Sequence, residues 1–399
     1  MKIALKDPLF VQALPIFNKI ADAGYQAYFV GGCVRDTILG LPIHDIDIAT
    51  SARPEEIEAI FPITIDVGKE HGTIIVVHQQ ASYEVTTFRT ESDYSDYRHP
   101  DSVDFVRTLQ EDTLRRDFTI NALAFDQEGR LYDYHGGAQD IERRLIRAVG
   151  HPADRFREDA LRIVRAIRFA SQLGFDIDGP TLEAIRQEAH LLPKIAIERV
   201  RIEMSKFFAG PYFNQVADLI WQANIAQALP LLRDYPLPVA MSHMTKKMQG
   251  HQGLAESVHW HLFCQGLGIE ARQTYLRKWS HSNQLILEVE QAATLEPIIV
   301  EGQLSPWEVY AYPMFLVEDL MRIHGQDPAI AHHLAQILPI QSKKDLCVSG
   351  KVMMDWLGLS QGNASLGKVI KLVERAVVMG QLKNDPGAIK DFVLANYSA

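Results

Sequence analysis

The chain has 399 residues, a length that suggests roughly two to four domains, and its 47% hydrophobic and 23% charged residues are ordinary for globular proteins. The formal net charge of -10 excludes a protein that coats nucleic acid indiscriminately, because such proteins carry a strong basic excess. It leaves room for an enzyme whose positive charge is confined to one face. Such a local excess occurs at 141–170, where eight arginines stand against four acids.

The three cysteines, Cys33, Cys264 and Cys347, stand far apart, and none belongs to a CxxC pair. This spacing argues against a disulfide framework or a zinc ribbon and favours a reducing, cytoplasmic location. Lys6 and Asp7 interrupt the N-terminal segment before the apolar core of a signal peptide can form. No run of about 18 apolar residues occurs, so no membrane partner is expected.

The first 150 residues are typical of a mixed α/β domain. The apolar run 25–30 predicts a buried strand, and a glycine pair leads from it into a helix over 34–39 that stops at Gly40. Apolar and acidic residues alternate over 45–48, which predicts a strand with both acids on one face. A helix is predicted over 54–60, between two prolines.

Further along this domain, β-branched runs at 73–78 and 82–89 predict two paired strands. The polar, tyrosine-rich segment 91–102 is predicted to be a mobile loop, and 119–125 is predicted to be another strand.

From about residue 152 the pattern changes to helical spacing. A long helix is predicted over 153–173, where Gly174 supplies a C-terminal stop. The whole segment 152–399 is expected to be almost entirely helical, and it contains no obvious internal repeat.

The first cluster of candidate site residues combines a glycine turn, an arginine and two acids: Gly31-Gly32-x-x-Arg35-Asp36 and Asp45-x-Asp47. Two carboxylates so placed repel each other unless a hard divalent cation lies between them, and Mg²⁺ prefers such oxygen ligands. Glycines let backbone N–H groups approach a triphosphate, and Arg35 adds a donor for phosphate oxygens. The combination predicts phosphoryl or nucleotidyl transfer, although a DxD pair alone is more often an ordinary feature of a strand.

A second cluster, RRDFTIN at 115–121, lies where a helix is predicted to pass into a strand. One interpretation is that Arg116 reaches the nucleotide phosphates while Asp117 and Asn121 fix the sugar. The alternative is a surface charge cluster around a turn.

The third cluster, Asp159, Arg162, Arg165 and Arg168, lies on the predicted long helix. At about 100° per residue, Asp159 and Arg162 are neighbours one turn apart, and the other arginines continue the row. A solvated stripe of ion pairs is the alternative. The intervening residues are so apolar, however, that most of the helix must be buried, which favours a functional cleft.

Taken together and in this order, the clusters closely resemble the class II tRNA nucleotidyltransferases, the CCA-adding enzymes, and their poly(A) polymerase relatives. The segments that carry the resemblance are GGCVRDTILGLPIHDIDIAT (31–50), EVTTFRT (84–90), RRDFTINALAFD (115–126), DYHGG (133–137) and FREDALRIVRAIRF (156–169). A weaker similarity covers 365–385.

The resemblance implies an α+β fold, in which a polymerase-β-like nucleotidyltransferase head with a mixed sheet and helices precedes an all-α neck, body and tail. The implied boundaries are 1–150 for the head with its metal site, 151–215 for the neck with the base-reading helix, 216–310 for the body, and 311–399 for a tail that binds tRNA.

Residue roles follow from the same resemblance. Asp45 and Asp47 are implied to bind Mg²⁺ and to be catalytic, and Glu84 is a candidate third carboxylate. Asp159 and Arg162 are implied to read the base. The full set of implied nucleotide-binding residues is Gly32, Arg35, Arg116, Asp159, Arg162, Arg165 and Arg168.

Hydrogen-bond chemistry makes this base-reading role reasonable. A carboxylate accepts hydrogen bonds and a guanidinium only donates them. Cytosine and adenine each present an amino donor beside ring acceptors, which suits Asp159 and Arg162. Uracil and guanine present a carbonyl oxygen and an N–H instead, and each mismatched contact costs on the order of 1–3 kcal/mol.

The implied reaction is template-independent addition of C, C and A to the 3′ end of tRNA. The 3′-hydroxyl attacks the α-phosphate of CTP or ATP, and pyrophosphate leaves. The expected partners are therefore tRNA, CTP and ATP, with a homodimer as an open assembly state.

Other activities share these motifs. A complete loop at 91–105 favours full CCA addition over CC addition, and a poly(A) polymerase is expected to carry a longer basic C-terminal extension. A non-catalytic RNA-binding relative has no use for the crowded Asp45 and Asp47. The near-Walker sequence at 362–368 is interpreted as coincidence, because Val369 stands where a metal-binding hydroxyl is needed.

Overall fold

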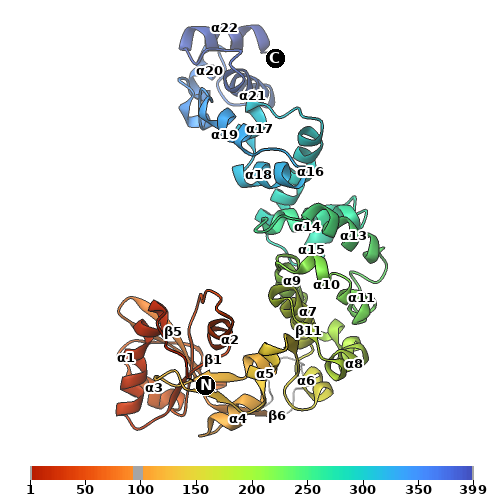
Figure 1. Ribbon diagram of the computed structural model, residues 1–399. Helices are drawn as coiled ribbons and strands as arrows, with labels where there is room; N and C mark the ends of the chain where they lie inside the picture. The colour runs from red at the N-terminus through yellow and green to blue at the C-terminus, as the bar shows by residue number, and fades with distance from the viewer. Residues whose placement is uncertain (1, 93–101, 398–399) are drawn as a thin grey trace. The chain divides into compact units, whose positions relative to one another are not determined.

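The protein is described by a computed structural model that covers residues 2–92 and 102–397 (Figure 1). The chain forms two compact units, Met1–Pro238 and Val239–Ala399. Within the described residues, none of the helices combines the length and the apolar character needed to cross a bilayer.

The first unit is built around a seven-stranded mixed sheet with the strand order β3-β4-β5-β2-β1-β8-β9. Its strands are β1 (Ala27–Val30), β2 (Asp47–Thr50), β3 (Thr64–Gly68), β4 (Thr73–His78), β5 (Ala81–Thr87), β8 (Leu123–Phe125) and β9 (Leu131–Asp133). β2 is parallel to β5, and the other neighbouring pairs are antiparallel. In this register Asp47 lies beside Val30 on one neighbour and beside Glu84 on the other.

Five helices accompany the sheet strands along this part of the chain: α1 (Pro8–Asp22), α2 (Gly32–Leu39), α3 (Pro54–Ile60), α4 (Leu109–Leu114) and α5 (Gly137–Glu142). α1 packs against β1 through an apolar face, and the rings of Phe10 and Phe29 lie 4.7 Å apart. Asp7 caps this helix by accepting a hydrogen bond from the amide of Leu9, which satisfies a backbone donor that has no partner inside the helix.

Most of the strand and helix predictions for this domain are confirmed. The helix over 54–60 and the strand over 73–78 are present, and its predicted partner at 82–89 is present as 81–87. The helix before Gly40 ends there in a left-handed backbone conformation. The strand that carries the acid pair is shorter than predicted, because β2 begins at Asp47 and Asp45 precedes it.

The prediction of a loop over 91–102 is wrong at its two ends, which belong to strands. β6 (Arg89–Ser92) and β7 (Ser102–Phe105) form an antiparallel pair of their own, which brings the ends of the loop together. The remaining positions, 93–101, lie outside the described residues, and so does most of the loop whose completeness favours CCA addition.

The predicted strand over 119–125 is wrong in its first half. Thr119–Asn121 forms a 3₁₀ turn, and only Leu123–Phe125 is a strand. The Thr119 hydroxyl donates to Asp140 at 2.5 Å, and the Asn121 amide donates to Asp117 at 3.0 Å. These side-chain hydrogen bonds stabilise a turn in place of strand pairing.

The predicted single helix over 153–173 is wrong, because the chain forms α6 (Pro152–Glu158) and α7 (Leu161–Leu173) with a break between them. Asp159 lies in the break with an extended backbone (φ -137°, ψ 100°). Its carboxylate accepts a hydrogen bond from the Leu161 amide at 3.0 Å, so the side chain caps the second helix and competes with continuation of the first. The predicted stop at Gly174 is confirmed.

The rest of the first unit is helical apart from one short strand pair, β10 (Leu145–Ile146) with β11 (Asp176–Ile177). The helices are α8 (Gly179–Glu188), α9 (Ile197–Phe208), α10 (Phe213–Val216), α11 (Leu219–Gln222) and α12 (Ile225–Ala228). α9 packs along α7. This contact matters for the site, because it brings side chains of α9 to the helix that carries the predicted arginine row.

The second unit consists of helices throughout its described residues. They are α13 (Leu237–Met248, which begins at the unit boundary), α14 (Glu256–Gly266), α15 (Arg272–Lys278), α16 (Asn283–Val300), α17 (Pro306–Ala311), α18 (Met314–Ile323), α19 (Ala329–Gln336), α20 (Gly350–Trp356), α21 (Ala364–Val378) and α22 (Pro386–Asn396). One buried apolar cluster joins α20, α21 and α22 around Met353, Val373 and Ile389. The predicted fold class, a mixed-sheet head followed by helices, is confirmed.

Candidate active site

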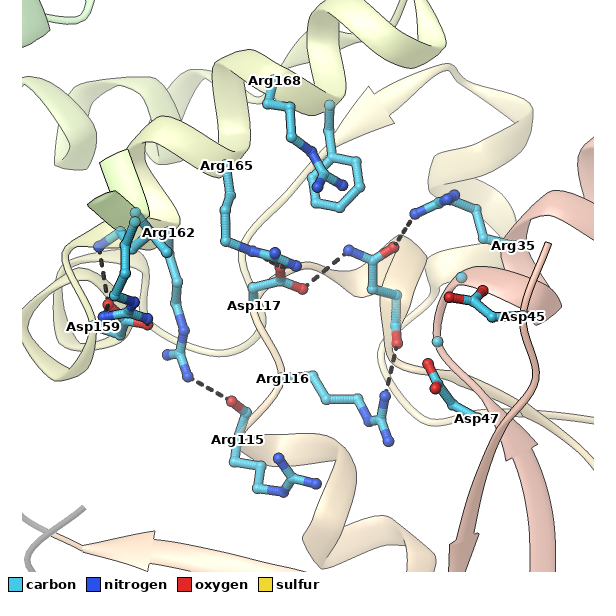
Figure 2. A pocket seen from close by; sticks show the side chains of 16 residues that line it. Arg35, Asp45, Asp47, Arg115, Arg116, Asp117, Asp159, Arg162, Arg165 and Arg168 are labelled. Carbon is cyan, nitrogen blue, oxygen red and sulfur yellow. Dashed lines mark hydrogen bonds and ion pairs between the residues drawn. The ribbon is translucent and has the colours of Figure 1, made fainter. Parts of the chain in front are cut away.

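A pocket of about 510 Å³ in the first unit brings together all nine residues predicted to be catalytic or to bind nucleotide or metal. The nine predicted residues that line it are Gly32, Arg35, Asp45, Asp47, Arg116, Asp159, Arg162, Arg165 and Arg168. Figure 2 shows Asp45 and Asp47 on one wall, and Asp159 and Arg162 on the opposite wall. Seven arginines and four aspartates line the pocket, so it carries a net positive charge suited to a polyanion.

Asp47 is the first residue of β2 and Asp45 precedes the strand, and the alternating Ile46 and Ile48 are buried. Burial, together with the nearby charges of Glu84 and Asp45, raises the pKa of Asp47 to about 6 against the opposing effect of Arg116. A carboxylate in this environment is costly to ionise without a nearby cation.

These two carboxylates suit a divalent metal ion. Among the described residues, no group of three or more His, Cys, Asp or Glu side chains is arranged to hold a metal. Asp45 and Asp47 offer hard oxygen donors of the kind by which Mg²⁺ is bound, through one or two carboxylates together with substrate phosphates and water. The raised pKa of Asp47 agrees with this, because a bound cation would favour the ionised form.

The glycine turn joins β1 to α2 next to the acids. Gly31 has φ 75° and ψ -131°, a conformation that only glycine adopts readily. A Cβ atom there would lie 3.6 Å from both Arg116 Nη1 and Asp47 Oδ2, so the turn is also close to the site. One turn into the helix, Arg35 donates to Asp36 and, at 2.7 Å, to Asn121.

Asp117 is the centre of a buried hydrogen-bond chain. Arg165 donates to its Oδ2 from two nitrogens, at 2.9 and 2.7 Å, and Asn121 donates to its Oδ1. Burial acts to raise the pKa of Asp117, but Arg165 and Asn121 outweigh it and hold the pKa at about 2. The prediction that Asp117 and Asn121 fix the sugar stays a prediction, and in this structure their side chains position Arg165 and Arg35.

The predicted base-reading pair has partners that the sequence did not indicate. Arg199 of α9 donates to both oxygens of Asp159, at 3.3 and 2.8 Å. Arg162 donates to Glu158 at 2.7 Å and to the carbonyl oxygens of Arg155 and Arg115. Because the helix breaks at Asp159, the prediction that Asp159 and Arg162 share one continuous helix is wrong, although the two residues remain close along the chain and both side chains line the pocket.

Figure 2 shows Arg165 and Arg168 along the upper side of the pocket, whose lining also includes Phe169. The guanidinium of Arg168 lies 4.0 Å from the centre of the ring, and Arg35 and Arg165 lie 5.2 and 5.3 Å from it. Glu203 of α9 pairs with Arg168 at 3.4 Å and with Arg165 at 3.7 Å. Burial lowers the pKa of Arg168 to about 10, so the side chain remains charged at neutral pH.

Sequence reasoning missed Arg199, Glu203 and Asp112, which hold pocket residues in place. The first two lie on α9, which packs against α7, the helix that carries the predicted arginines. No local sequence pattern distinguishes them. Asp112 lies three residues before the recognised RRD sequence, at helical spacing from both arginines, and that spacing was the available signal.

A second, smaller pocket of about 180 Å³ adjoins the first. Its lining comes from β1, β2, β4, β5 and β6 and from the two arginines that follow α4, and it includes Glu84 and Thr86. Glu84 lies beside Asp47 in the sheet but lines this second pocket and not the first, so its role as a third carboxylate stays a prediction.

A mixed sheet that presents paired acids beside a glycine turn and a cluster of arginines defines a nucleotidyltransferase. Three family models agree with this class. "Poly A polymerase head domain" matches 27–147, a model for an RNA- and SrmB-binding site of polymerase A matches 174–235, and "tRNA nucleotidyltransferase domain 2" matches 254–393.

Full-length relatives identify the family. The chain is 41% identical to a CCA-adding enzyme of Geobacillus sp. (strain WCH70), with 98% of each chain covered, and 42% identical to that of Limosilactobacillus reuteri, with 96% of each covered. The crystal structure of Bacillus stearothermophilus CCA-adding enzyme in complex with CTP superposes with a TM-score of 0.81 at 37% identity and covers 98% of both chains. The chain belongs to the CCA-adding enzymes.

Membership of this family confirms the predicted resemblance and enzyme class. The alternatives of a poly(A) polymerase, a CC-adding enzyme and a non-catalytic relative are not favoured, because these relatives are CCA-adding enzymes over their whole length. A Thermotoga maritima enzyme complexed with tRNA_CCA is 20% identical, with a TM-score of 0.61, and supports the fold alone.

Proposed function

We propose that this chain adds C, C and A to the 3′ end of tRNA from CTP and ATP without a nucleic-acid template, and releases pyrophosphate. One observation supports this most directly: the acid pair and the Asp159–Arg162 pair face a single arginine-lined pocket. A nucleotide between the two walls would place its phosphates near Asp45 and Asp47 and its base near the other pair.

Asp45 and Asp47 are the proposed ligands of Mg²⁺. When bound, the ion would neutralise charge on the phosphates and activate the attacking 3′-hydroxyl of the tRNA. Arg35 and Arg116 would orient the triphosphate, and the backbone at Gly32 would approach its oxygens closely. Positive charge from these arginines would also stabilise the departing pyrophosphate.

Asp159 and Arg162 are proposed to select the base through their fixed donor and acceptor pattern. Arg199 would hold the Asp159 carboxylate while its remaining lone pairs accept the amino group of cytosine or adenine. Arg165 and Arg168 would line the same nucleotide site, and Phe169 supplies an apolar surface between them.

The four-part division into head (1–150), neck (151–215), body (216–310) and tail (311–399) is retained as a proposal. The helical parts would grip tRNA through its phosphates and 2′-hydroxyls. A cytoplasmic location and a homodimer also stay predictions.

Loss of the acid pair tests the proposed chemistry. We expect Asp45→Ala with Asp47→Ala to abolish CTP incorporation into tRNA that lacks its CCA end, while the fold stays intact by circular dichroism. As a matched control, Asp22→Ala with Glu128→Ala removes two exposed acids of the same unit and should leave incorporation unchanged. Residual activity of the first variant near the control level would refute the metal assignment.

The products formed from a CTP and ATP mixture test the overall reaction. Full-length CCA ends are expected. Termination after two cytidines, or long adenosine tracts, would instead support CC addition or poly(A) synthesis.

A further inference from the structure

Asp112 is a fully buried carboxylate whose role none of the motifs above explains. It lies on α4, with 0% of its surface exposed. Its Oδ1 accepts a hydrogen bond from Arg115 Nε at 2.9 Å, and its Oδ2 accepts one from Arg116 Nη2 at 3.1 Å. The two arginines follow it at i+3 and i+4, so a single helical turn presents both guanidinium groups to one carboxylate.

Arg115 and Arg116 lie at the boundary between the two pockets. Among the described residues, only Asp47, Arg115 and Arg116 line both pockets. Arg116 Nη1 also lies near Asp47, since a Cβ atom on Gly31 would be 3.6 Å from each. The direction in which Arg116 points therefore decides whether it serves the phosphates or pairs with a metal-binding carboxylate.

A long arginine side chain needs such an anchor. Arginine loses rotamer entropy when its side chain is fixed, and the nearby carboxylate of Asp47 competes for its charge. Asp112 offers one oxygen to each guanidinium, while Arg116 Nη1 donates to the carbonyl oxygen of Asn121 at 3.5 Å. Burial acts to raise the pKa of Asp112, but Arg115 and Arg116 outweigh it and lower the pKa, so the group is ionised.

Asp112 also ties the arginines to neighbouring elements. Its Oδ1 accepts a hydrogen bond from the amide of Arg89 at 3.3 Å, at the first residue of β6. The carbonyl oxygen of Arg115 in turn accepts from Arg162 at 2.7 Å. The same turn of α4 is thus connected to the strand pair β6–β7 and to the opposite wall of the pocket.

We propose that Asp112 is a positioning residue that aims Arg116, together with Arg115, at the triphosphate and away from the metal-binding carboxylates. It governs how strongly the phosphates are bound and takes no part in reading the base. This inference rests on the proposed assignment of Arg116 to the triphosphate.

The test compares CTP with CMP, which share a base and differ in their phosphates. Asp112→Asn keeps the shape of the side chain and removes its charge. Because charge-assisted hydrogen bonds are lost, CTP binding should weaken about tenfold or more, whereas CMP binding should change much less. The preference for CTP over UTP in incorporation should stay unchanged, and the loss should appear in KM more than in kcat.

Glu111→Gln provides the matched control, because it neutralises an exposed acid one residue earlier on the same helix. It should leave CTP and CMP binding unchanged. If Asp112→Asn weakens CTP and CMP by the same factor, its role is merely structural and the inference is overturned. Should this variant fail to fold, Asp112→Glu is measured in its place; a selective loss of CTP binding supports the inference, and an unchanged CTP to CMP ratio overturns it.

A double-mutant cycle with Arg116→Lys separates this inference from the assignment on which it rests. If Asp112 acts through Arg116, the combined effect on CTP binding should fall well below the product of the two single effects. Fully multiplicative effects would overturn the role of Asp112 while leaving Arg116 in place. If Arg116→Lys alone leaves the CTP to CMP ratio unchanged, the assignment of Arg116 itself fails.

Discussion

At the scale of single residues, the pocket is organised before any nucleotide enters. Asp159 is held by Arg199, and Arg162 is held by Glu158 and two carbonyl oxygens. Partly buried ion pairs of this kind contribute little net stability, because desolvation offsets their attraction. Their benefit is geometric: a fixed donor and acceptor pattern costs less to align with a base than two mobile side chains would.

Asp159→Asn tests base selection at this scale. The amide carries a donor as well as an acceptor, so it can turn its N–H₂ toward the carbonyl oxygen of uracil. We expect discrimination between CTP and UTP to fall about tenfold or more, measured by single-nucleotide incorporation. Asp154→Asn changes an exposed acid of the preceding helix and should preserve discrimination. Unaltered discrimination in the Asp159 variant would exclude a base-reading role.

At the scale of elements, close backbone contacts determine whether a glycine that begins a helix can be replaced by a larger residue. Gly137 and Gly179 are both the first residue of a helix, α5 and α8. A Cβ atom on Gly137 would lie 2.1 Å from the carbonyl oxygen of Thr119, whereas one on Gly179 would have no neighbour within 4 Å. The first glycine therefore permits α5 to pack against the 3₁₀ turn that precedes β8.

These two glycines give a stability prediction. Gly137→Ala should lower the free energy of unfolding by about 1–3 kcal/mol, because the added methyl group forces backbone shifts in a packed region. Gly179→Ala should be neutral or stabilising by up to about 1 kcal/mol, since it restricts the unfolded chain without a clash. Urea unfolding of the two variants measures both effects. Equal stabilities would show that the contact with Thr119 is not restrictive.

Helical spacing predicted which residues of 153–173 are buried, but it did not predict the break at Asp159. The spacing reports an apolar face, and α6 and α7 share such faces on either side of the break. The break depends on a local hydrogen bond to Leu161 and on Arg199, which is distant in the sequence. Periodicity carries no information about either contact.

At the scale of the whole molecule, the second unit contains ionisable groups in its interior. Burial lowers the pKa of His259 to about 4, and the side chain is 3% exposed. Glu296 is held by His261 and His324, each at 2.8 Å. Burial acts to raise the pKa of Glu296, but hydrogen bonds from these partners outweigh it and lower the pKa to about 2.

His259 makes the stability of the chain depend on pH. An unfolded histidine has a pKa of about 6.5, so between this value and about 4 the unfolded state binds more protons than the folded state. Stability should therefore be greatest above pH 6.5 and fall as the pH drops toward 4. The pKa difference corresponds to a loss on the order of 3 kcal/mol from this group.

Calorimetric melting of the full chain between pH 7 and pH 4 measures this dependence. His259→Gln should flatten it relative to the unmodified chain. His333→Gln removes an exposed histidine of the same unit and should leave the slope unchanged. Parallel curves for all three proteins would contradict the role of His259.

The sequence by itself determined the acid pair, the glycine turn and the arginine clusters, because these residues are close neighbours along the chain and their chemistry is local. It also determined the mixed-sheet head and the helical remainder, since alternation and helical spacing reflect burial directly. The resemblance to the class II tRNA nucleotidyltransferases then implied that these clusters, from Gly32 to Arg168, form one site.

Only the tertiary structure decided how that site is held together. Asp47 gains its raised pKa from burial and from Glu84 on a neighbouring strand. Asp159 is fixed by Arg199 from another helix. These contacts join residues far apart in the sequence, and their strength depends on burial and on distances of a few ångströms, which only the packing of the elements sets.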